Sequence, residues 1–152
     1  MNIVIRKGNY EDVPSIVTLG TEMHEESSFA SFDWDNDKVI NFADKAVAKD
    51  NFCFFVAEVD GNYAGMVIGS VQEFFFGKDL ELVDFIWYVR PGYRNSSVGA
   101  QLIDSFIEFG KEKKCKGIYV RIGTNVQPTK TAKLLSKLGF ISTGGMFVYK
   151  VN

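Results

Sequence analysis

The segment that most constrains the fold of this chain is 82–102, where an apolar run gives way to a turn, a loop of small residues and an amphipathic helical pattern. The apolar run predicts a strand that ends at Val89. The loop contains Ser96, Ser97 and Gly99 and leads directly into the helix. Backbone N–H groups at a helix start lack partners within the helix, and small side chains let a diphosphate approach them. The segment therefore indicates a site for a phosphorylated ligand.

Bulk properties restrict the class of protein. A length of 152 residues predicts one domain spanning 1–152. The formal net charge of −2 gives no surface of the kind that nucleic acid requires. No apolar run reaches the roughly 18 residues of a membrane span, and the amino terminus lacks a signal-peptide core. We therefore expect a cytoplasmic protein with neither a nucleic-acid nor a membrane partner.

The residues that most often bind metals are scarce. Cys53 and Cys115 have no ligand spacing and are too few for a disulfide framework, so both are expected to be reduced. The chain has a single histidine. Because zinc sites usually combine several Cys and His ligands, the sequence predicts no metal site.

Hydrophobic periodicity and turn residues divide the chain into alternating helices and strands. Asp60-Gly61 between two apolar runs predicts a hairpin, and a second turn at 77–79 adds a third antiparallel strand. A helix between strands implies a parallel crossover. The expected strands are 2–7, 52–59, 63–75, 80–90, 117–122 and 145–151, and the expected helices are 11–25, 39–47, 98–113 and one that begins at Pro128.

The stretch 94–99, with the sequence RNSSVG, resembles the Arg/Gln-x-x-Gly-x-Gly/Ala signature of the GNAT superfamily of N-acetyltransferases. Arg94 and Gly99 match this signature, and Ser97 replaces its first glycine. The order of the surrounding strands and the closing AKLLSKLGF at 132–140 are also similar to the family. In this superfamily the signature binds the pyrophosphate of acetyl-CoA.

The resemblance implies an α/β fold with a mixed, mostly antiparallel sheet of six to seven strands. A splayed parallel pair of strands and about four flanking helices belong to this fold. It also implies an enzyme that transfers the acetyl group of acetyl-CoA to a primary amine of a small molecule or a protein. Direct attack is expected, because no Cys/His or Ser/His pair is evident. The alternative is a non-catalytic acyl-CoA-binding module or sensor.

The resemblance also assigns residues to acetyl-CoA. The backbone of Val89 would donate to the oxyanion that forms at the thioester carbonyl. Arg94 would add positive charge beside the phosphates. Asn125 would bind the pantetheine arm or nearby backbone, and it could also cap the helix before Pro128. The complete expected set is Tyr88, Val89, Arg94, Asn95, Ser96, Ser97, Val98, Gly99, Ala100, Asn125 and Ala132.

The groups that move protons are less clear from the sequence. Asp84 is an acidic residue in an apolar strand, where burial would raise its pKa toward that of a useful general base. An equally good interpretation is a carboxylate that binds turn amides or pairs with a lysine. The family's general acid is a tyrosine at the position that Leu135 occupies, so the general acid stays unassigned. Water is the alternative for both steps.

The acceptor amine is expected to bind near the first two helices, where acidic side chains could attract a cation. The alternative is a solvated acidic loop. His24, Glu25 and Phe76 are the expected contacts, and a phenylalanine of the run 74–76 could instead form a homodimer contact. The acidic residues in this region are Glu22, Glu25, Glu26, Asp33, Asp35 and Asp37.

Overall fold

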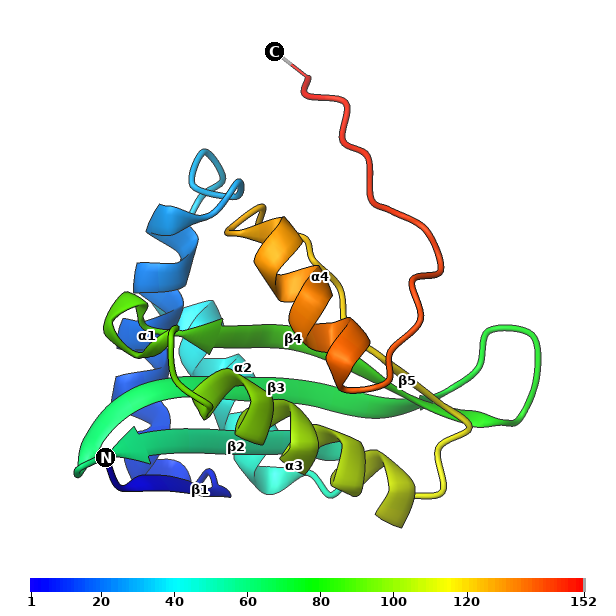
Figure 1. Ribbon diagram of the computed structural model, residues 1–152, viewed down its shortest axis with the longest axis horizontal. Coiled ribbons are helices and arrows are strands. Elements are labelled where there is room, and N and C mark those ends of the chain that lie inside the picture. Colours follow the sequence, from blue (N-terminus) through cyan, green and yellow to red (C-terminus); the bar gives the residue numbers. More distant parts are fainter. Residues whose placement is uncertain (152) are drawn as a thin grey trace.

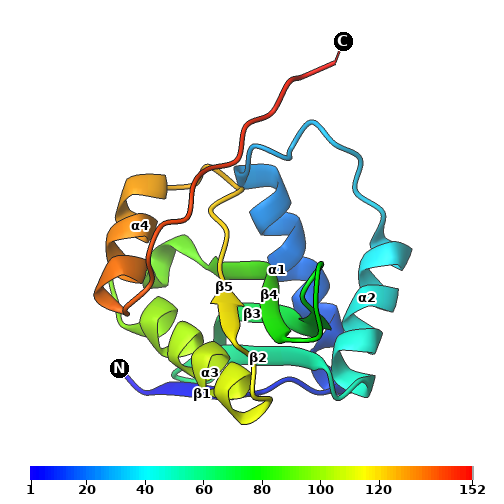
Figure 2. The ribbon, with the colours of Figure 1, turned by 90° about the vertical axis from the view of Figure 1, so that its right-hand side faces the viewer.

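A five-stranded sheet in the order β1-β2-β3-β4-β5 forms the centre of the structure, a computed structural model that describes residues 1–151 (Figure 1). Helices α1 and α2 cover one face of the sheet, and α3 and α4 cover the other (Figure 2). The elements are β1 (Ile3–Lys7), the 3-10 helix η1 (Tyr10–Asp12), α1 (Val13–Glu26), α2 (Asn36–Ala48), β2 (Phe52–Val59), β3 (Asn62–Glu73), β4 (Leu80–Val89), the 3-10 helix η2 (Pro91–Tyr93), α3 (Val98–Glu112), β5 (Gly117–Tyr119) and α4 (Pro128–Lys137).

The pairing of the strands confirms the predicted mixed sheet. Strands β1 to β4 are antiparallel neighbours, and β5 pairs with β4 in parallel. Successive residues of β2 point to opposite faces, so Val56 joins the core beneath α1 and Ala57 joins the core beneath α3. Ile16 and Phe106 are fully buried in these two cores. Both faces of the central strands are therefore apolar, as their nearly continuous hydrophobic runs indicate.

Glycine allows β3 and β4 to approach closely. A Cβ at Gly65 would lie 2.5 Å from the Tyr88 carbonyl oxygen, and one at Gly69 would lie 2.5 Å from the Val83 carbonyl oxygen. The predicted Asp60-Gly61 turn is also confirmed, with φ values of 50° and 82° that fit a tight hairpin.

A β-bulge in β4 reverses the faces of its side chains. Ile68 pairs with Ile86 and Gly69 pairs with Asp84, so Phe85 is an extra residue on β4. Before the bulge, Leu82 packs in the α3 core, whereas Tyr88 packs in the α1 core after it. Regular alternation would place positions 82 and 88 on the same face. The bulge therefore sets which side chains of β4 reach each side of the sheet.

Two strand predictions need correction. β5 ends at Tyr119 and not at 122, because its ladder with β4 stops there and the Arg121 N–H donates instead to the Asp84 carboxylate. Residues 145–151, predicted to close the sheet, form no strand in the described chain. The backbone after Gly139 turns outward and away from the sheet (Figure 1), so it has no strand beside it. The sheet of residues 1–151 therefore has five strands and not six or seven.

No helix of residues 1–151 is long and apolar enough to cross a membrane. Within the same range, no group of three or more His, Cys, Asp or Glu side chains is arranged to hold a metal ion.

A partly buried ion cluster joins the first three strands to the start of α1. Arg6 donates to both carboxylate oxygens of Asp12 at 2.8 Å and to Glu58 at 2.8 Å. The Tyr63 hydroxyl donates to Asp12 at 2.5 Å, and only 1% of the Asp12 surface is exposed. Burial alone would raise the pKa of Asp12. Hydrogen bonds from Arg6, Tyr63 and the Asn9 amide outweigh it and lower the pKa to about 2.

Asp12→Asn should lower the free energy of unfolding by about 2 kcal/mol at neutral pH, the value that corresponds to a pKa held near 2 instead of 3.8. Because the folded-state pKa is the lower one, this contribution is present above pH 3.8 and is lost as the pH falls toward 2. Denaturant unfolding at a series of pH values measures it. The exposed neighbour provides the control variant Glu11→Gln. A difference between wild type and Asp12→Asn that is as large at pH 2 as at neutral pH would contradict this explanation.

Candidate functional site

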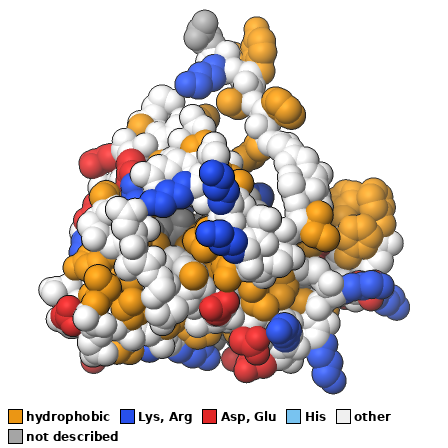
Figure 3. All heavy atoms as spheres, in the orientation of Figure 1, with side chains coloured by type: hydrophobic (Ala, Val, Ile, Leu, Met, Phe, Trp, Pro, Cys, Tyr) orange, Lys and Arg blue, Asp and Glu red, His pale blue; other side chains and the backbone are white. Residues whose placement is uncertain are grey.

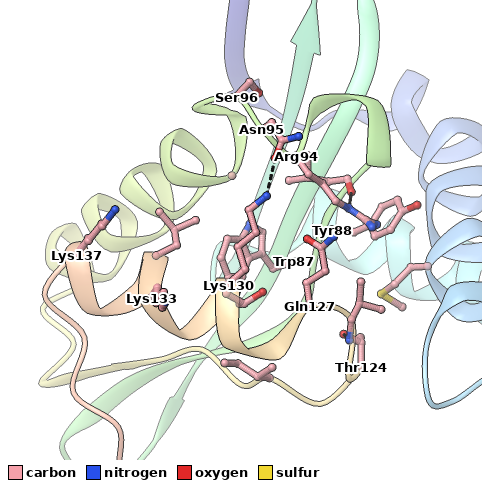
Figure 4. A pocket seen from close by; sticks show the side chains of 17 residues that line it. Trp87, Tyr88, Arg94, Asn95, Ser96, Thr124, Gln127, Lys130, Lys133 and Lys137 are labelled. Carbon is pink, nitrogen blue, oxygen red and sulfur yellow. Dashed lines mark hydrogen bonds between the residues drawn. The ribbon is translucent and has the colours of Figure 1, made fainter.

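A cavity of about 480 Å³ lies at the carboxyl end of β4, where β4 and β5 separate (Figure 4). Its walls come from β4, the 94–99 segment, the chain after β5, helix α4 and the end of α1. The lining residues are Met23, Trp87, Tyr88, Val89, Arg94, Asn95, Ser96, Gly99, Ile122, Thr124, Val126, Gln127, Lys130, Thr131, Lys133, Leu134 and Lys137.

The structure brings together about half of the residues that the sequence analysis assigned to acetyl-CoA. Those in the lining are Tyr88, Val89, Arg94, Asn95, Ser96 and Gly99. In the described chain, Ser97, Val98, Ala100 and Asn125 adjoin lining residues in sequence but are not part of the lining. Ala132 instead lines a second cavity, between α3, β5 and α4.

The end of β4 directs backbone groups into the space between β4 and β5. The Arg90 N–H donates to the Ala64 carbonyl in β3 at 2.8 Å. Along a strand the N–H and C=O groups of successive residues point to alternate edges, so those of Val89 point away from β3. The Val89 carbonyl accepts from the Arg94 Nε at 2.8 Å, which agrees with this direction. The Val89 N–H therefore faces the side where the cavity opens.

The first turn of α3 is open toward the cavity. A Cβ at Gly99 would lie 3.6 Å from Trp87 and 3.7 Å from Val89 and Leu134. The Ser97 hydroxyl accepts from the Gln101 side chain at 2.9 Å, so it is turned along the helix. The Val98 N–H donates to Ser96 Oγ at 3.3 Å and the Gln101 N–H donates to the Ser97 carbonyl at 2.9 Å. The Gly99 and Ala100 N–H groups lie between them at the helix start, where intrahelical partners are lacking, and are the donors of this site.

Two arginines after β4 are paired with glutamates of α1. Arg90 donates twice to Glu22, at 2.8 and 2.9 Å. Arg94 donates to both carboxylate oxygens of Glu26, one of them at 2.6 Å. Hydrogen bonding to Arg94 lowers the pKa of Glu26 more than burial raises it. The charge of Arg94 is thus largely balanced within the protein, and the two pairs fix α1 against the end of β4.

Helix α4 supplies the cations that the sequence analysis missed. Lys130, Lys133 and Lys137 all line the cavity, and the Lys130 Nζ donates to Asn95 Oδ1 at 2.6 Å (Figure 4). Basic side chains gather over α4 in the middle of this face of the molecule (Figure 3). Their spacing of three and four residues places them on one side of a helix. That spacing was visible in the sequence, but the prediction of this helix considered only its apolar side.

Trp87 is a second residue that the sequence analysis missed. Its indole Nε1 is buried and has no hydrogen-bond partner among residues 1–151, whereas other atoms of the side chain line the cavity. A buried N–H without a partner is costly, and a ligand carbonyl in the cavity would satisfy it. This donor, the open helix start and the lysines fit a ligand that carries both amides and phosphates, as acetyl-CoA does.

A family model described as "Acetyltransferase (GNAT) family" matches residues 19–140. The chain belongs to the GNAT family. Acetyl-CoA is accordingly its co-substrate, and the activity of the family is N-acetyl transfer. A search of curated proteins gave no match.

Solved structures confirm that the whole chain has a GNAT fold. The aminoglycoside acetyltransferase AAC(6')-Iy, in complex with a bisubstrate analogue, is 19% identical with a TM-score of 0.80, and the match covers 100% of this chain and 99% of that one. A predicted acetyltransferase with acetyl-CoA from Clostridium acetobutylicum is 14% identical, with a TM-score of 0.79 and coverage of 98% and 96%. An aminoglycoside acetyltransferase from an uncultured soil metagenomic sample, in complex with sisomicin, is 18% identical, with a TM-score of 0.70 and coverage of 99% and 97%.

Asp84 of this GNAT protein is buried, and burial raises the pKa of its carboxyl, the direction predicted from the sequence. Hydrogen bonds from Arg121 oppose that effect. The carboxylate accepts from the Arg121 backbone N–H at 3.3 Å and from Nε at 3.1 Å. Among residues 1–151 it lies outside the cavity lining. These contacts match the alternative in which Asp84 binds backbone amides and a cation, with arginine in place of lysine.

The residues expected at the acceptor lie at two distant places. His24 and Glu25 are at the end of α1, next to the lining residue Met23. Phe76 is 83% exposed in the turn between β3 and β4, at the opposite end of β4 from the cavity (Figure 1). Leu135, at the position of the family's tyrosine, is buried in the α3 core.

Gly99→Val should weaken binding of acetyl-CoA about tenfold or more, a change of roughly 1.4 kcal/mol, because two γ-carbons would occupy the space in front of the α3 start. Gly99→Ala is the matched control, since its Cβ fits at the ordinary contact distances of 3.6–3.7 Å. Calorimetric titration compares the two variants. Equal affinity of Gly99→Val and wild type would show that the first turn of α3 does not contact the co-substrate.

Proposed function

We propose that this GNAT protein acetylates a primary amine of a small cationic molecule by direct attack on the thioester of acetyl-CoA. The observation that carries this proposal is the cavity at the end of β4, where three features converge. These are the Val89 backbone, the start of α3 at Gly99 and the lysine-bearing side of α4. We treat residues 1–152 as one catalytic domain, and we keep the cytoplasm as its predicted location.

The co-substrate would be held along the cavity by groups of different chemistry. The N–H groups of Gly99 and Ala100 would bind the diphosphate, with Lys133 and Lys137 adding positive charge. The indole N–H of Trp87 would donate to a carbonyl of the pantetheine arm. Because the Ser97 hydroxyl is engaged by Gln101, its presence in place of glycine is compatible with phosphate binding.

The backbone N–H of Val89 would stabilise the oxyanion of the tetrahedral intermediate. It belongs to a strand and is directed away from β3, so no side-chain movement is needed to present it. We assign no side chain as the general acid, because Leu135 lies in the core. Water would then protonate the departing thiolate.

The acceptor would approach from the end of α1 and the loop after it. Of the acidic residues in this region, Glu22 and Glu26 are paired with arginines, and Asp35 accepts from the Lys38 N–H at the start of α2. Glu25 and Asp33 are exposed and available to a cation. This arrangement favours a polycationic small molecule. Two similar structures are aminoglycoside acetyltransferases, one of them in complex with sisomicin.

The His24 ring gives this side of the site a second recognition element. Its Nε2 is buried without a hydrogen-bond partner in the described chain, and the ring lies 5.1 Å from that of Trp34. A hydroxyl or amine of the acceptor that reached this nitrogen would satisfy it. His24 and Glu25 together thus support the predicted acceptor contacts at the end of α1.

The proposal is tested by thiol release from acetyl-CoA with a panel of aminoglycosides, polyamines and peptides with free amino termini. We expect turnover with a polycationic small molecule, and a raised KM in the variants Glu25→Gln and Asp33→Asn. The matched control is Asp104→Asn, which removes an exposed carboxylate on α3. Binding of acetyl-CoA without thiol release for any amine would instead support the non-catalytic acyl-CoA-binding module.

Asp84→Asn separates the two roles of this residue. The base role stays a prediction from the sequence, whereas the contacts with Arg121 support a structural role. If the role is structural, we expect the substitution to lower the free energy of unfolding by about 1–3 kcal/mol, because an amide cannot accept every hydrogen bond that the carboxylate accepts. Turnover per folded enzyme would change little. A loss of about 100-fold in kcat with unchanged thermal stability would establish Asp84 as the base.

A further inference from the structure

A pair of oppositely charged side chains links helix α1 to the residue whose backbone would stabilise the oxyanion. Each guanidinium nitrogen of Arg94 donates a hydrogen bond, Nη1 and Nη2 to the Glu26 carboxylate and Nε to the Val89 carbonyl at 2.8 Å. Only 16% of the Arg94 side-chain surface is exposed. The family resemblance implies a charge beside the phosphates, whereas these contacts direct the side chain toward α1 and the end of β4.

The peptide group between Val89 and Arg90 is held from both sides. Its N–H donates to the Ala64 carbonyl in β3 at 2.8 Å, and its carbonyl accepts from Arg94. β5 pairs with β4 only near the start of β4, so among the described strands no neighbour reaches the open edge at Val89. Arg94 therefore supplies the hydrogen bond that a neighbouring strand would otherwise donate to this carbonyl. Fixing this peptide limits rotation about the Val89 Cα–C bond and so holds the direction of the Val89 N–H.

Glu26 and Tyr88 hold the Arg94 guanidinium in this position. A bidentate pair fixes both the distance and the plane of a guanidinium. The guanidinium carbon lies 5.6 Å from the centroid of the Tyr88 ring, a distance at which the ring attracts a cation (Figure 4). The Tyr88 ring is buried in the α1 core, and Glu26 belongs to α1 itself. Arg94 is thus oriented by the helix on the acceptor side of the site.

A second ion pair has the same chemistry but a different backbone contact. Arg90 donates twice to Glu22, which lies four residues before Glu26 on the same side of α1. The remaining guanidinium nitrogen of Arg90 donates to the Tyr63 carbonyl in β3 at 3.0 Å. Both pairs join α1 to the chain after β4, but only the first pair reaches the carbonyl at the end of β4. The second pair therefore provides a matched control for the first.

We propose that Glu26 and Arg94 are positioning residues for acetyl transfer. Held by Glu26, Arg94 occupies the Val89 carbonyl and keeps the N–H of the same residue directed at the thioester. This inference rests on the acetyl transfer proposed for the site. Substitution of either residue leaves the N–H groups of α3 and the lysines of α4 in place, so acetyl-CoA still binds. The rate falls, because a displaced oxyanion donor weakens the transition state more than the bound ground state.

The kinetics of Glu26→Gln and Arg94→Lys test the proposal, with Glu22→Gln as the control. Lysine keeps the charge of Arg94 but cannot serve the carboxylate and the carbonyl together. We expect kcat to fall about tenfold in both variants, with little change in the calorimetric Kd for acetyl-CoA. Glu22→Gln should keep the wild-type kcat, and thermal melting verifies that all three variants are folded. A loss of kcat in Glu22→Gln as large as in Glu26→Gln would overturn the proposal, because a general loosening of α1 would explain both.

Acetyl-pantetheine, which lacks the diphosphate and the adenosine, separates positioning from phosphate binding. With this substrate, Glu26→Gln and Arg94→Lys should lose the same factor in turnover as they lose with acetyl-CoA. The double variant should lose no more than either single variant, because the two residues act through one contact. A raised Kd for acetyl-CoA with unchanged turnover of acetyl-pantetheine would show instead that Arg94 contacts the diphosphate, and it would overturn the proposal.

The amide signal of Val89 in nuclear magnetic resonance spectra gives a result that does not require turnover. Acetyl-CoA should shift this signal more than CoA does, because only acetyl-CoA carries the thioester carbonyl. Most of this difference should be lost in Glu26→Gln and Arg94→Lys and kept in Glu22→Gln. Its persistence in all three variants would overturn the positioning role in an active enzyme. The expected pattern in a protein that releases no thiol would support the positioning role and refute the proposed acetyl transfer.

Discussion

The separation of β4 from β5 is the constraint on which the site depends. The two strands are joined over only three residue pairs, from Glu81 to Val83. Immediately beyond, a bulge reverses the faces of β4, and the buried Asp84 carboxylate accepts from the Arg121 N–H at 3.3 Å. This bond gives the Arg121 amide a partner just past the point where the ladder ends. The cavity and the directed Val89 backbone both follow from this separation.

Electrostatic pairing then couples the two sides of the cavity. Arg90 and Arg94 follow β4, and their partners Glu22 and Glu26 lie on the α1 side, where the acceptor is proposed to bind. The Ser28 N–H also donates to the Thr124 carbonyl at 2.8 Å, which ties the loop after α1 to the loop before α4. Positive charge for phosphate is supplied by the lysines of α4. The exposed carboxylates Glu25 and Asp33 lie outside the cavity lining, at the end of α1 and in the loop after it.

Local signals in the sequence were sufficient for most of the fold. The Asp60-Gly61 turn, the helical periodicities and the small residues before α3 each reflect interactions between near neighbours. Long-range pairing could not be predicted in this way. Arg121 is 37 residues from Asp84, and Glu26 is 68 residues from Arg94. A residue that looks catalytic or phosphate-binding from its own segment is thus engaged by a partner that only the folded chain brings near.

Calorimetric titration of the purified protein with acetyl-CoA measures whether this cavity holds the co-substrate. ATP and NAD serve as controls that share the adenosine and phosphate groups but lack the pantetheine arm. We expect micromolar binding of acetyl-CoA and much weaker binding of both controls. Absence of acetyl-CoA binding, or equal affinity for all three ligands, would exclude this cavity as a selective acetyl-CoA site.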